Sequence, residues 1–435
     1  MKITMLTNTY LPHVGGVANS VREFSDGYRE RGHEVLVVAP EYDEEAPRAE
    51  ERNILRLPAL KNIQESNFSL ALPVSPKLRS SLREFGPDLL HSHHPFVIGD
   101  TALKLAASED LPLVFTYHTM YEHYTHYSPV SPGGVKEFII ELATGYANLC
   151  DRVVAPSESV ARILRDRGVR TPVVVIPTGV NAEKFGDGDP GRGRRENELP
   201  QDVPVIGHVG RLAPEKNLEF LGKAFARCLR QRDDAHALIV GDGDTREDLE
   251  GIFDGTGVSD QVRMPGVLKG QKLVDAYHAM DVFGFASKTE TQGMALAEAL
   301  AAGCPVVALD APGAREIVRD GQNGRLLQRE DAKEFADALG SVLEKSVEQG
   351  DRLAASCRSS VEEYRAERCI GRMLGLYEGL LEGEPRPRKS GERAGTSVPE
   401  TLEQMGRLWV NRLRALARAF VRERPAESEG EKETQ

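Results

Sequence analysis

Cysteine is scarce in this sequence, and the few cysteines lie far apart. Five occur in 435 residues, and none forms a Cys-x-x-Cys pair or shows the spacing of a zinc site. An odd, dispersed set in a chain of this length is typical of reduced thiols and excludes the disulfide framework of a small secreted domain. The first residues, MKITMLTNTYLP, are too short and too polar for a signal peptide. We therefore expect a cytoplasmic protein.

Long apolar runs and an excess of basic charge are also missing. No stretch approaches the roughly 18 consecutive apolar residues of a membrane-spanning helix. Lys and Arg total 55 against 67 Asp and Glu, a net charge of −12, which argues against nucleic acid as the main partner. The glycine turn of the first predicted strand, HVGGV, is not a GxGxxG turn, and a GxxxxGK phosphate loop occurs nowhere in the chain, so neither nucleotide-binding motif explains that turn.

Apolar strands and amphipathic helices alternate in two successive series. The first series begins at residue 2, and the second begins at residue 203 with VPVIGHVGRL. Near-continuous apolar strands between helices indicate parallel sheets that are covered on both faces. The segment from Gly186 to Val203 is rich in glycine, charge and proline, which predicts a linker. The sequence thus predicts two doubly wound, Rossmann-like α/β domains facing a cleft, with ligands at the carboxyl ends of the strands.

Two motifs at predicted strand ends are suited to binding an anion. Gly15 and Gly16 lie between a strand and a helix, where the backbone can approach a ligand and the helix N-terminus offers N–H groups. Such a pair also occurs in tight turns for structural reasons alone. Arg211 and Lys216 follow the strand VIGHV, and their side chains suit a diphosphate. Alone, two cations at this spacing are more typical of a solvated loop.

The stretch SKTETQGMALAEAL places two glutamates around a strand-to-helix turn. Gln292, Gly293 and Met294 offer unpaired backbone N–H groups, which form a seat for phosphate. Glu298, on the helix, can accept hydrogen bonds from two ribose hydroxyls, and Glu290, before the turn, is placed for sugar hydroxyls. The alternative is that neither glutamate binds a ligand. In that case Glu290 would only complement the positive end of the helix dipole, and Glu298 would be a solvated residue in the middle of the helix.

Taken in order and spacing, these motifs resemble the family-four retaining glycosyltransferases of the GT-B fold, over residues 1 to about 383. The shared features are the opening strand with GGV, RGHEV, HVGRLAPEKN, VGDGDTREDLE, the pair Glu290 and Glu298, and EALAAGCPVVALDAPGAREIVRDGQNGRLL. More narrowly, TYHTMYEHYTHY, IPTGV and TETQG resemble the branch that glucosylates diacylglycerol. That branch uses UDP-glucose, and neighbouring branches use GDP-mannose or UDP-sulfoquinovose.

The resemblance implies an architecture and a reaction. It implies an acceptor-side domain over residues 1–185, a nucleotide-sugar domain over 200–365, a helical segment over 366–383 that returns to the first domain, and a tail over 385–435. The implied reaction moves a hexose, glucose from UDP-glucose, onto a hydroxyl of a membrane lipid such as diacylglycerol. A soluble sugar or polysaccharide acceptor and mannose from GDP-mannose remain alternatives.

Roles carried over from the family concern five residues of the donor site. Arg211 and Lys216 would hold the diphosphate and stabilise the leaving nucleotide. Glu290 would touch the donor sugar, Glu298 would bind the ribose, and Gly16 would lie near the diphosphate and acceptor. No carboxylate pair is placed as in a glycosidase, so catalysis would rest on positioning and electrostatics, with attack on the face that the nucleotide leaves.

The resemblance also assigns an active-site histidine and bears on whether the site holds a metal ion. His118, in TYHT, corresponds to the active-site histidine near the transferred sugar. Histidines gather around it in the sequence, without an acid-supported ligand geometry: His91, His93, His94, His123 and His126. The resemblance explains the DxD of Asp242 and Asp244 as a turn beside the nucleotide. We therefore expect no metal and no further cofactor.

The C-terminal segment extends beyond the family pattern. After a basic linker from Pro385, an apolar helical stripe that includes Trp409, Leu413 and Phe420 is opposed by arginines that include Arg414 and Arg418. Residues 386–424 contain ten Lys or Arg and four Asp or Glu, which gives this segment a net charge of +6. Such a helix can lie on an anionic membrane surface, which predicts peripheral attachment. It can equally pack on the enzyme or on a second subunit, and the acidic end is expected to be disordered.

Overall fold

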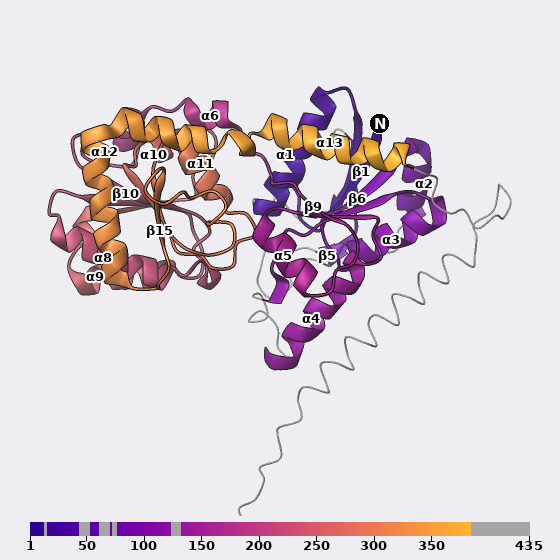
Figure 1. The fold of residues 1–435 in the computed structure, drawn as a ribbon, viewed down its shortest axis with the longest axis horizontal. Helices are drawn as coiled ribbons and strands as arrows, with labels where there is room; N and C mark the ends of the chain where they lie inside the picture. Colours follow the sequence, from indigo (N-terminus) through magenta and orange to yellow (C-terminus); the bar gives the residue numbers. More distant parts are fainter. Residues whose placement is uncertain (13–14, 43–52, 61–69, 72–75, 123–131, 384–435) are drawn as a thin grey trace, which may run out of the picture.

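The computed structural model describes residues 1–12, 15–42, 53–60, 70–71, 76–122 and 132–383, which form two α/β domains (Figure 1). None of the helices in these ranges combines the length and the apolar character required to span a bilayer. The tail over residues 385–435 lies outside them. Its expected membrane contacts therefore stay predictions, and they are Trp409, Leu413, Arg414, Arg418 and Phe420.

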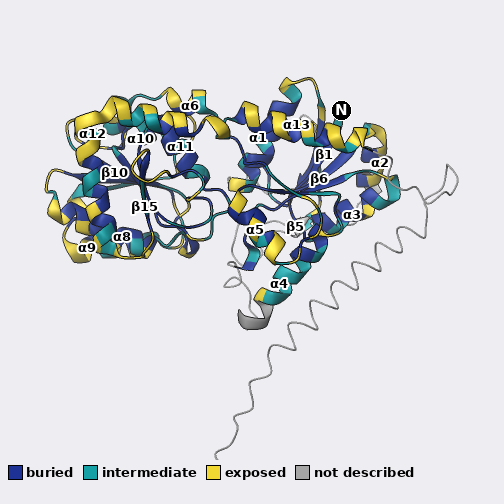
Figure 2. Ribbon diagram, viewed as in Figure 1, coloured by how far each residue is buried: buried dark blue, intermediate teal, exposed yellow. Residues whose placement is uncertain are grey.

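The N-terminal domain is built on a seven-stranded parallel sheet in the order β3-β2-β1-β6-β7-β8-β9. Helices lie on both of its faces, so most strand residues are buried, whereas those of the edge strand β9 are only partly buried (Figure 2). The strands are β1 (Lys2–Leu6), β2 (Glu34–Pro40), β3 (Ile54–Leu57), β6 (Leu89–Ser92), β7 (Leu113–Thr116), β8 (Arg152–Ala155) and β9 (Val173–Val175), and β4 (Ala59–Leu60) pairs separately with β5 (Leu70–Ala71). The helices are α1 (Gly16–Glu30), α2 (Pro76–Phe85), α3 (Ile98–Glu109), α4 (Pro132–Ala147) and α5 (Glu158–Asp166).

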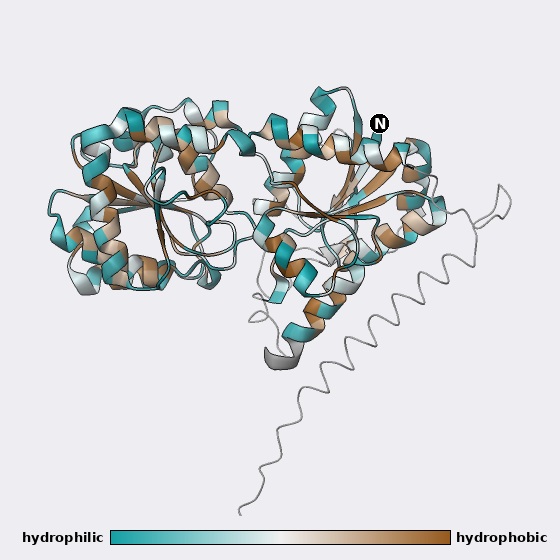
Figure 3. Cartoon of the chain, in the orientation of Figure 1, coloured by the Kyte–Doolittle hydropathy of each residue, from teal (hydrophilic) through white to brown (hydrophobic). Residues whose placement is uncertain are grey.

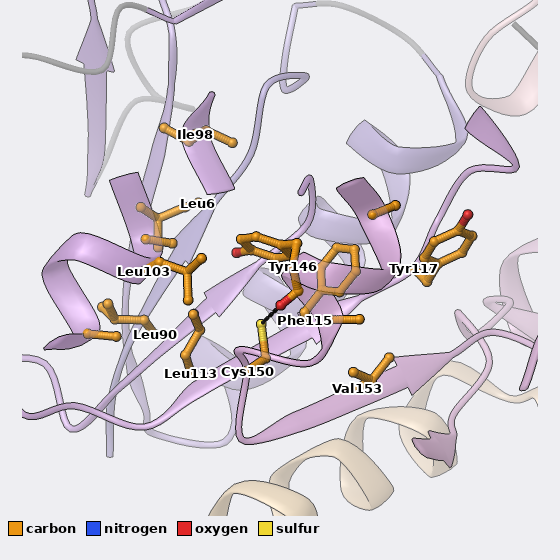
Figure 4. Close-up of a cluster of buried hydrophobic side chains, with 14 of the residues drawn as sticks. Leu6, Leu90, Ile98, Leu103, Leu113, Phe115, Tyr117, Tyr146, Cys150 and Val153 are labelled. Carbon is orange, nitrogen blue, oxygen red and sulfur yellow. Dashed lines mark hydrogen bonds between the residues drawn. The ribbon is translucent and has the colours of Figure 1, made fainter. Parts of the chain in front are cut away.

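This sheet separates the hydrophobic core of the domain into two layers. Ile3 and Met5 of β1 belong to the layer that includes residues of α1, whereas Leu6 belongs to the layer that includes residues of α3. Figure 4 shows the second layer, in which Phe115 and Tyr146 meet edge to face with ring centroids 4.9 Å apart. Because successive side chains point to opposite faces, a strand buried on both faces has a continuous apolar sequence.

The C-terminal domain repeats this plan around a six-stranded parallel sheet in the order β12-β11-β10-β13-β14-β15. Its apolar strands lie inside and its more polar helices lie outside (Figure 3). The strands are β10 (Val205–Val209), β11 (His236–Val240), β12 (Val262–Gly266), β13 (Val282–Phe285), β14 (Val306–Leu309) and β15 (Gly324–Leu327). The helical elements are α6 (Ala182–Gly186), α7 (Pro190–Glu196), η4 (Pro214–Lys216), α8 (Leu218–Gln231), α9 (Arg246–Thr256), η5 (Ser259–Gln261), α10 (Gln271–His278), α11 (Met294–Ala302), α12 (Ala332–Ser360) and η6 (Glu362–Tyr364).

The linker expected from residue 186 is instead part of the C-terminal domain, and that prediction was wrong. Helix α7 begins there with Asp189 as its cap, whose side chain accepts a hydrogen bond from the backbone N–H of Arg192. The Arg192 guanidinium then donates to both carboxylate oxygens of Asp275 in α10, at 2.5 and 2.8 Å. This pairing holds the pKa of Asp275 at about 2. A non-local ion pair thus folds a segment whose local composition is typical of a linker.

The chain crosses between the two domains twice, near Val180 and near Arg365, and the backbones of the two crossing segments are in contact. Val180 and Arg365 form an isolated parallel bridge, with hydrogen bonds from Val180 N to Tyr364 O at 2.7 Å and from Ala366 N to Val180 O at 3.0 Å. The approach is so close that a Cβ on Gly179 would lie 2.2 Å from Cα of Ala366. Glycine is required at this position because any side chain would separate the two crossings.

Helix α13 (Ala366–Glu382) follows the second crossing and packs on α1 of the N-terminal domain (Figure 1). Its Tyr377 is fully buried, and the hydroxyl oxygen lies 3.1 Å from the Tyr28 hydroxyl and 2.5 Å from Nδ1 of His91. The end of the described chain therefore belongs to the core of the first domain.

Candidate active site

Helices α1 and α11 are linked across the domain junction by side chains near their N-termini. Ser20, in the second turn of α1, has its hydroxyl 2.8 Å from the Thr178 hydroxyl. Gln292, just before α11, accepts a hydrogen bond from the backbone N–H of Thr178 at 2.6 Å and donates to its carbonyl at 2.5 Å. The carboxyl ends of the two sheets therefore meet here, where the sequence predicted the ligand.

The loop between β13 and α11 is tied to both domains. Ser287 and Thr289 donate from their hydroxyls to the carbonyl oxygen of Glu215 in η4, at 3.3 and 3.2 Å. Two residues later, the Thr291 hydroxyl donates to the carbonyl oxygen of His118 at 2.9 Å. One short loop thus connects the predicted cationic site to the predicted active-site histidine.

Two charged pairs line this loop. Lys216 forms an ion pair with Glu290, and about a fifth of each side chain is exposed (21% and 19%). Arg211 forms an ion pair with Glu215, whose side chain is 1% exposed, whereas that of Arg211 is 51% exposed. The buried carboxylate therefore anchors one edge of the guanidinium. The sequence predicted the two cations as phosphate ligands, and the structure places them on one loop beside Glu290.

The N-terminus of α11 is built around a left-handed glycine. Gly293 has φ +74°, and a Cβ on it would lie 2.8 Å from Cδ1 of Leu296, so both conformation and space require glycine. The backbone N–H groups of Met294 and Ala295 make no hydrogen bond to the described residues. They leave the open helix end that the sequence predicted as a phosphate seat.

Glu298 lies one turn further along α11. It accepts a hydrogen bond from the Tyr277 hydroxyl at 2.7 Å, and burial raises the pKa of its carboxyl group to about 7. Its partner differs from that of Glu290, which pairs with Lys216. The two glutamates therefore have different neighbours, as expected if each of them contacts a different part of the ligand.

His118 is half-buried beyond the end of β7 and is hydrogen-bonded to a second histidine. Its Nε2 lies 2.9 Å from Nδ1 of His93, with the rings stacked at a centroid distance of 5.1 Å. Burial lowers the pKa of both rings well below its usual range. Both imidazoles are therefore neutral at pH 7.

The glycine turn of the first domain is described only from its second half. Gly15 caps α1 with an extended backbone (φ −176°), and Gly16 is exposed with nothing within 4 Å of where a Cβ would lie. Packing does not explain the glycine at position 16, which leaves its backbone open to approach. In the described ranges, no group of three or more His, Cys, Asp and Glu residues is arranged to hold a metal.

Sequence reasoning missed two buried groups of the site. Glu215 anchors Arg211, and the signal for it is the spacing of four residues between them. His208 lies within the buried strand β10 and donates from Nδ1 to the carbonyl oxygen of Gly284 at 3.0 Å, whereas its buried Nε2 has no hydrogen-bond partner among the described residues. Burial and the nearby Lys216 lower the pKa of His208 to about 4. The signal for it is a lone polar residue in the apolar strand VIGHV.

Comparison with known proteins identifies the family. The model described as Glycosyltransferase Family 4 matches residues 14–184, and the model described as Glycosyl transferases group 1 matches residues 189–359. The GDP-mannose-dependent alpha-mannosyltransferase of Mycolicibacterium smegmatis is 31% identical over 386 residues, which cover 88% of this chain and 98% of that protein. The chain belongs to this glycosyltransferase family.

Two further similarities bear on this glycosyltransferase. The alpha-monoglucosyldiacylglycerol synthase of Streptococcus pneumoniae is 29% identical over 389 residues, covering 87% of this chain and 85% of that protein. The crystal structure of Anabaena HepE in complex with UDP-glucose aligns with a TM-score of 0.71 at 21% identity, covering 87% of this chain and all of that one. The predicted GT-B arrangement of two Rossmann-like domains is confirmed.

Proposed function

We propose that this glycosyltransferase transfers glucose from UDP-glucose onto a hydroxyl group of a membrane lipid such as diacylglycerol. The observation that carries the proposal is the loop between β13 and α11. It holds Glu290 beside Lys216, continues into the open end of α11, and is hydrogen-bonded through Thr291 to His118. Groups suited to a sugar, a diphosphate and a sugar acceptor thus share one short segment.

The donor is bound by charge and by backbone N–H groups. Arg211 and Lys216 neutralise the diphosphate and stabilise the leaving nucleotide, and the N-terminus of α11 adds N–H donors. Glu298 accepts the ribose hydroxyls, and Glu290 accepts hydroxyls of the glucose. With two cations and a helix end on the phosphates, the reaction is proposed to need no metal ion.

Retention of the anomeric configuration is part of the proposal. UDP-glucose is an α-glycoside, and the names of both curated relatives specify alpha products. The acceptor hydroxyl attacks the face from which the nucleotide departs, beside His118. Catalysis then comes mainly from positioning the two substrates and from stabilising the leaving diphosphate.

A lipid acceptor is supported by the name of the pneumococcal relative and by the basic, amphipathic sequence of residues 399–424. We place the enzyme on the surface of an anionic membrane, with that segment as its attachment. Truncation at Pro385 should reduce sedimentation with anionic vesicles, because each Lys or Arg near such a surface contributes about 1 kcal/mol. Equal sedimentation of the truncated and full-length chains would refute this attachment.

A second candidate, mannose transfer from GDP-mannose, is supported by the 31% identical mycobacterial relative. The deciding experiment supplies radiolabelled UDP-glucose or GDP-mannose to the full-length enzyme with diacylglycerol vesicles, with a total lipid extract, or with soluble sugars. Label from UDP-glucose in an α-linked glycolipid is expected, and its rate of incorporation should fall strongly in Lys216→Ala but stay at the wild-type level in Lys223→Ala. Lys223 is the matched control because its side chain is 56% exposed and forms an ion pair with Glu219, one turn away in its own helix.

A further inference from the structure

His93 lies directly behind His118 at the carboxyl edge of the first sheet. The two residues follow the neighbouring parallel strands β6 and β7, which are paired in register from Leu90 with Leu113 to Ser92 with Phe115. The His93 side chain is 1% exposed, and within the described part of the chain its one side-chain hydrogen bond joins its Nδ1 to Nε2 of His118. The other ring nitrogen, Nε2, is buried and has no partner among the same residues.

A hydrogen bond between two neutral imidazoles contains one proton. If His93 carries the proton on Nδ1, it donates and His118 accepts at Nε2. His118 must then carry its own proton on Nδ1. If instead His93 accepts, its proton is on the buried Nε2, and His118 has a bare Nδ1. The tautomer of His93 therefore sets the tautomer of His118.

The surroundings of His93 favour the first arrangement. In the second, the buried Nε2–H would be a donor without an acceptor, and orphaned buried N–H groups are rarer than unfilled acceptors in native proteins. The rings of His91 and His118 lie with their centroids 4.2 and 5.1 Å from that of His93, and burial lowers the pKa of both. Among the described residues, none accepts or donates a hydrogen bond at Nε2 of His93.

The second nitrogen of His118 is the one left for a ligand. Nδ1 makes no hydrogen bond to the described residues, and the ring is only half-buried, next to the junction loop that holds Thr291. A proton on Nδ1 makes His118 a hydrogen-bond donor there. A bare Nδ1 would make it a proton acceptor.

We propose that His93 is a positioning residue that holds His118 as the neutral Nδ1–H tautomer, so that His118 donates a hydrogen bond to the reacting sugars and does not act as a general base. This role rests on the proposed function for its chemical meaning. The tautomer itself is a property of the two rings and is measured without any substrate.

The experiment is two-bond nitrogen–proton correlation NMR on the full-length enzyme with 15N-labelled histidine at pH 7, with His118→Asn used to assign the signal. The wild-type enzyme should show His118 protonated at Nδ1. In His93→Phe the ring is kept but both nitrogens are removed, and His118 should shift toward the Nε2–H form. In His93→Asn the side-chain amide can still donate, and the Nδ1–H form should be largely restored.

Kinetics provide the second readout. His93→Phe should lower kcat roughly tenfold, the effect of one misplaced hydrogen bond, while the KM for the sugar nucleotide stays within about twofold. His94→Asn is the matched control, since His94 is also buried (7% exposed) but accepts a hydrogen bond from the backbone N–H of Asn8 at 3.1 Å and makes none to His118. It should leave the tautomer of His118 unchanged.

Three results would overturn the inference. They are an Nε2-protonated His118 in the wild-type enzyme, a tautomer that is the same in His93→Phe, and a loss of the Nδ1–H form in His94→Asn. The wild-type spectrum alone decides the first, whether or not a variant folds. The expected tautomer in a protein that transfers no sugar would leave the inference standing and refute the proposed function instead.

Discussion

Replacing Gln292 with leucine should impair the alignment of the two domains without unfolding either. The Gln292 side chain is 7% exposed, and its amide bonds both backbone groups of Thr178, which is itself 6% exposed. Leucine is similar in size but can neither donate nor accept. Each domain keeps its own hydrophobic clusters in this variant. The loss of the two hydrogen bonds should therefore mainly shift the equilibrium between the closed and the open arrangement of the two domains.

The size of the effect follows from the two hydrogen bonds. A neutral bond contributes a net of about 0.5–1.5 kcal/mol, so the pair favours the closed arrangement by about 1–3 kcal/mol. At about 1.4 kcal/mol for each factor of ten, kcat/KM should fall roughly 5- to 150-fold. Because water can reach the Thr178 groups once the domains separate, the free energy of unfolding should change less than this.

Steady-state kinetics and small-angle scattering provide the measurements. The variant should show lower kcat/KM and a larger radius of gyration with the nucleotide bound. Gln261→Leu is the matched control, because the Gln261 amide donates to the carbonyls of Arg232 and Ala235 within one domain, at 3.2 and 2.8 Å. It should lower the melting temperature but spare kcat/KM. A Gln292 variant with kcat/KM and scattering equal to wild type would refute the reasoning.

Three further predictions follow from single contacts. Lys216→Ala should lower kcat/KM roughly tenfold to a hundredfold, because it removes a charge-assisted contact worth about 1.5–3 kcal/mol, and wild-type turnover with every donor would contradict that role. The pKa of the Glu298 carboxyl group is raised from its usual 4.5 to about 7 in the folded state. Between pH 4.5 and pH 7, the folded state therefore keeps a proton that the unfolded state has released. Stability should therefore fall as pH rises from 4.5 to 7, and Glu298→Gln should lessen this fall in thermal unfolding whereas the exposed-site control Glu219→Gln should not. Gly179→Ala should lower the free energy of unfolding by about 1–3 kcal/mol through overpacking. The control Gly251→Ala, with nothing within 4 Å of its Cβ position, should raise it by about 0.4–1 kcal/mol. Equal melting temperatures for the two variants would show that the two crossing segments can separate to admit a side chain.

Local sequence patterns were enough to predict the architecture and to place the candidate ligand-binding residues at strand ends and helix starts. Apolar strands alternating with helices are a local pattern, and burial of both sheet faces follows from it. Positions such as Arg211 and Gly293 could be found because strand ends and helix starts are also local features. The glycine at 293 is required by its own φ of +74°, a constraint that neighbouring residues already indicate.

Which side chains meet could be seen only in the folded, three-dimensional structure. Lys216 and Glu290 are 74 residues apart, and Gln292 and Thr178 are 114 apart, so no periodicity connects them. The same reason explains the mistaken linker, since the partner that folds the segment around Arg192 is Asp275, 83 residues away. Local propensity is a weak preference of tenths of a kcal/mol per residue, and a doubly hydrogen-bonded ion pair to the buried carboxylate of Asp275 outweighs it once the chain has brought the two partners together.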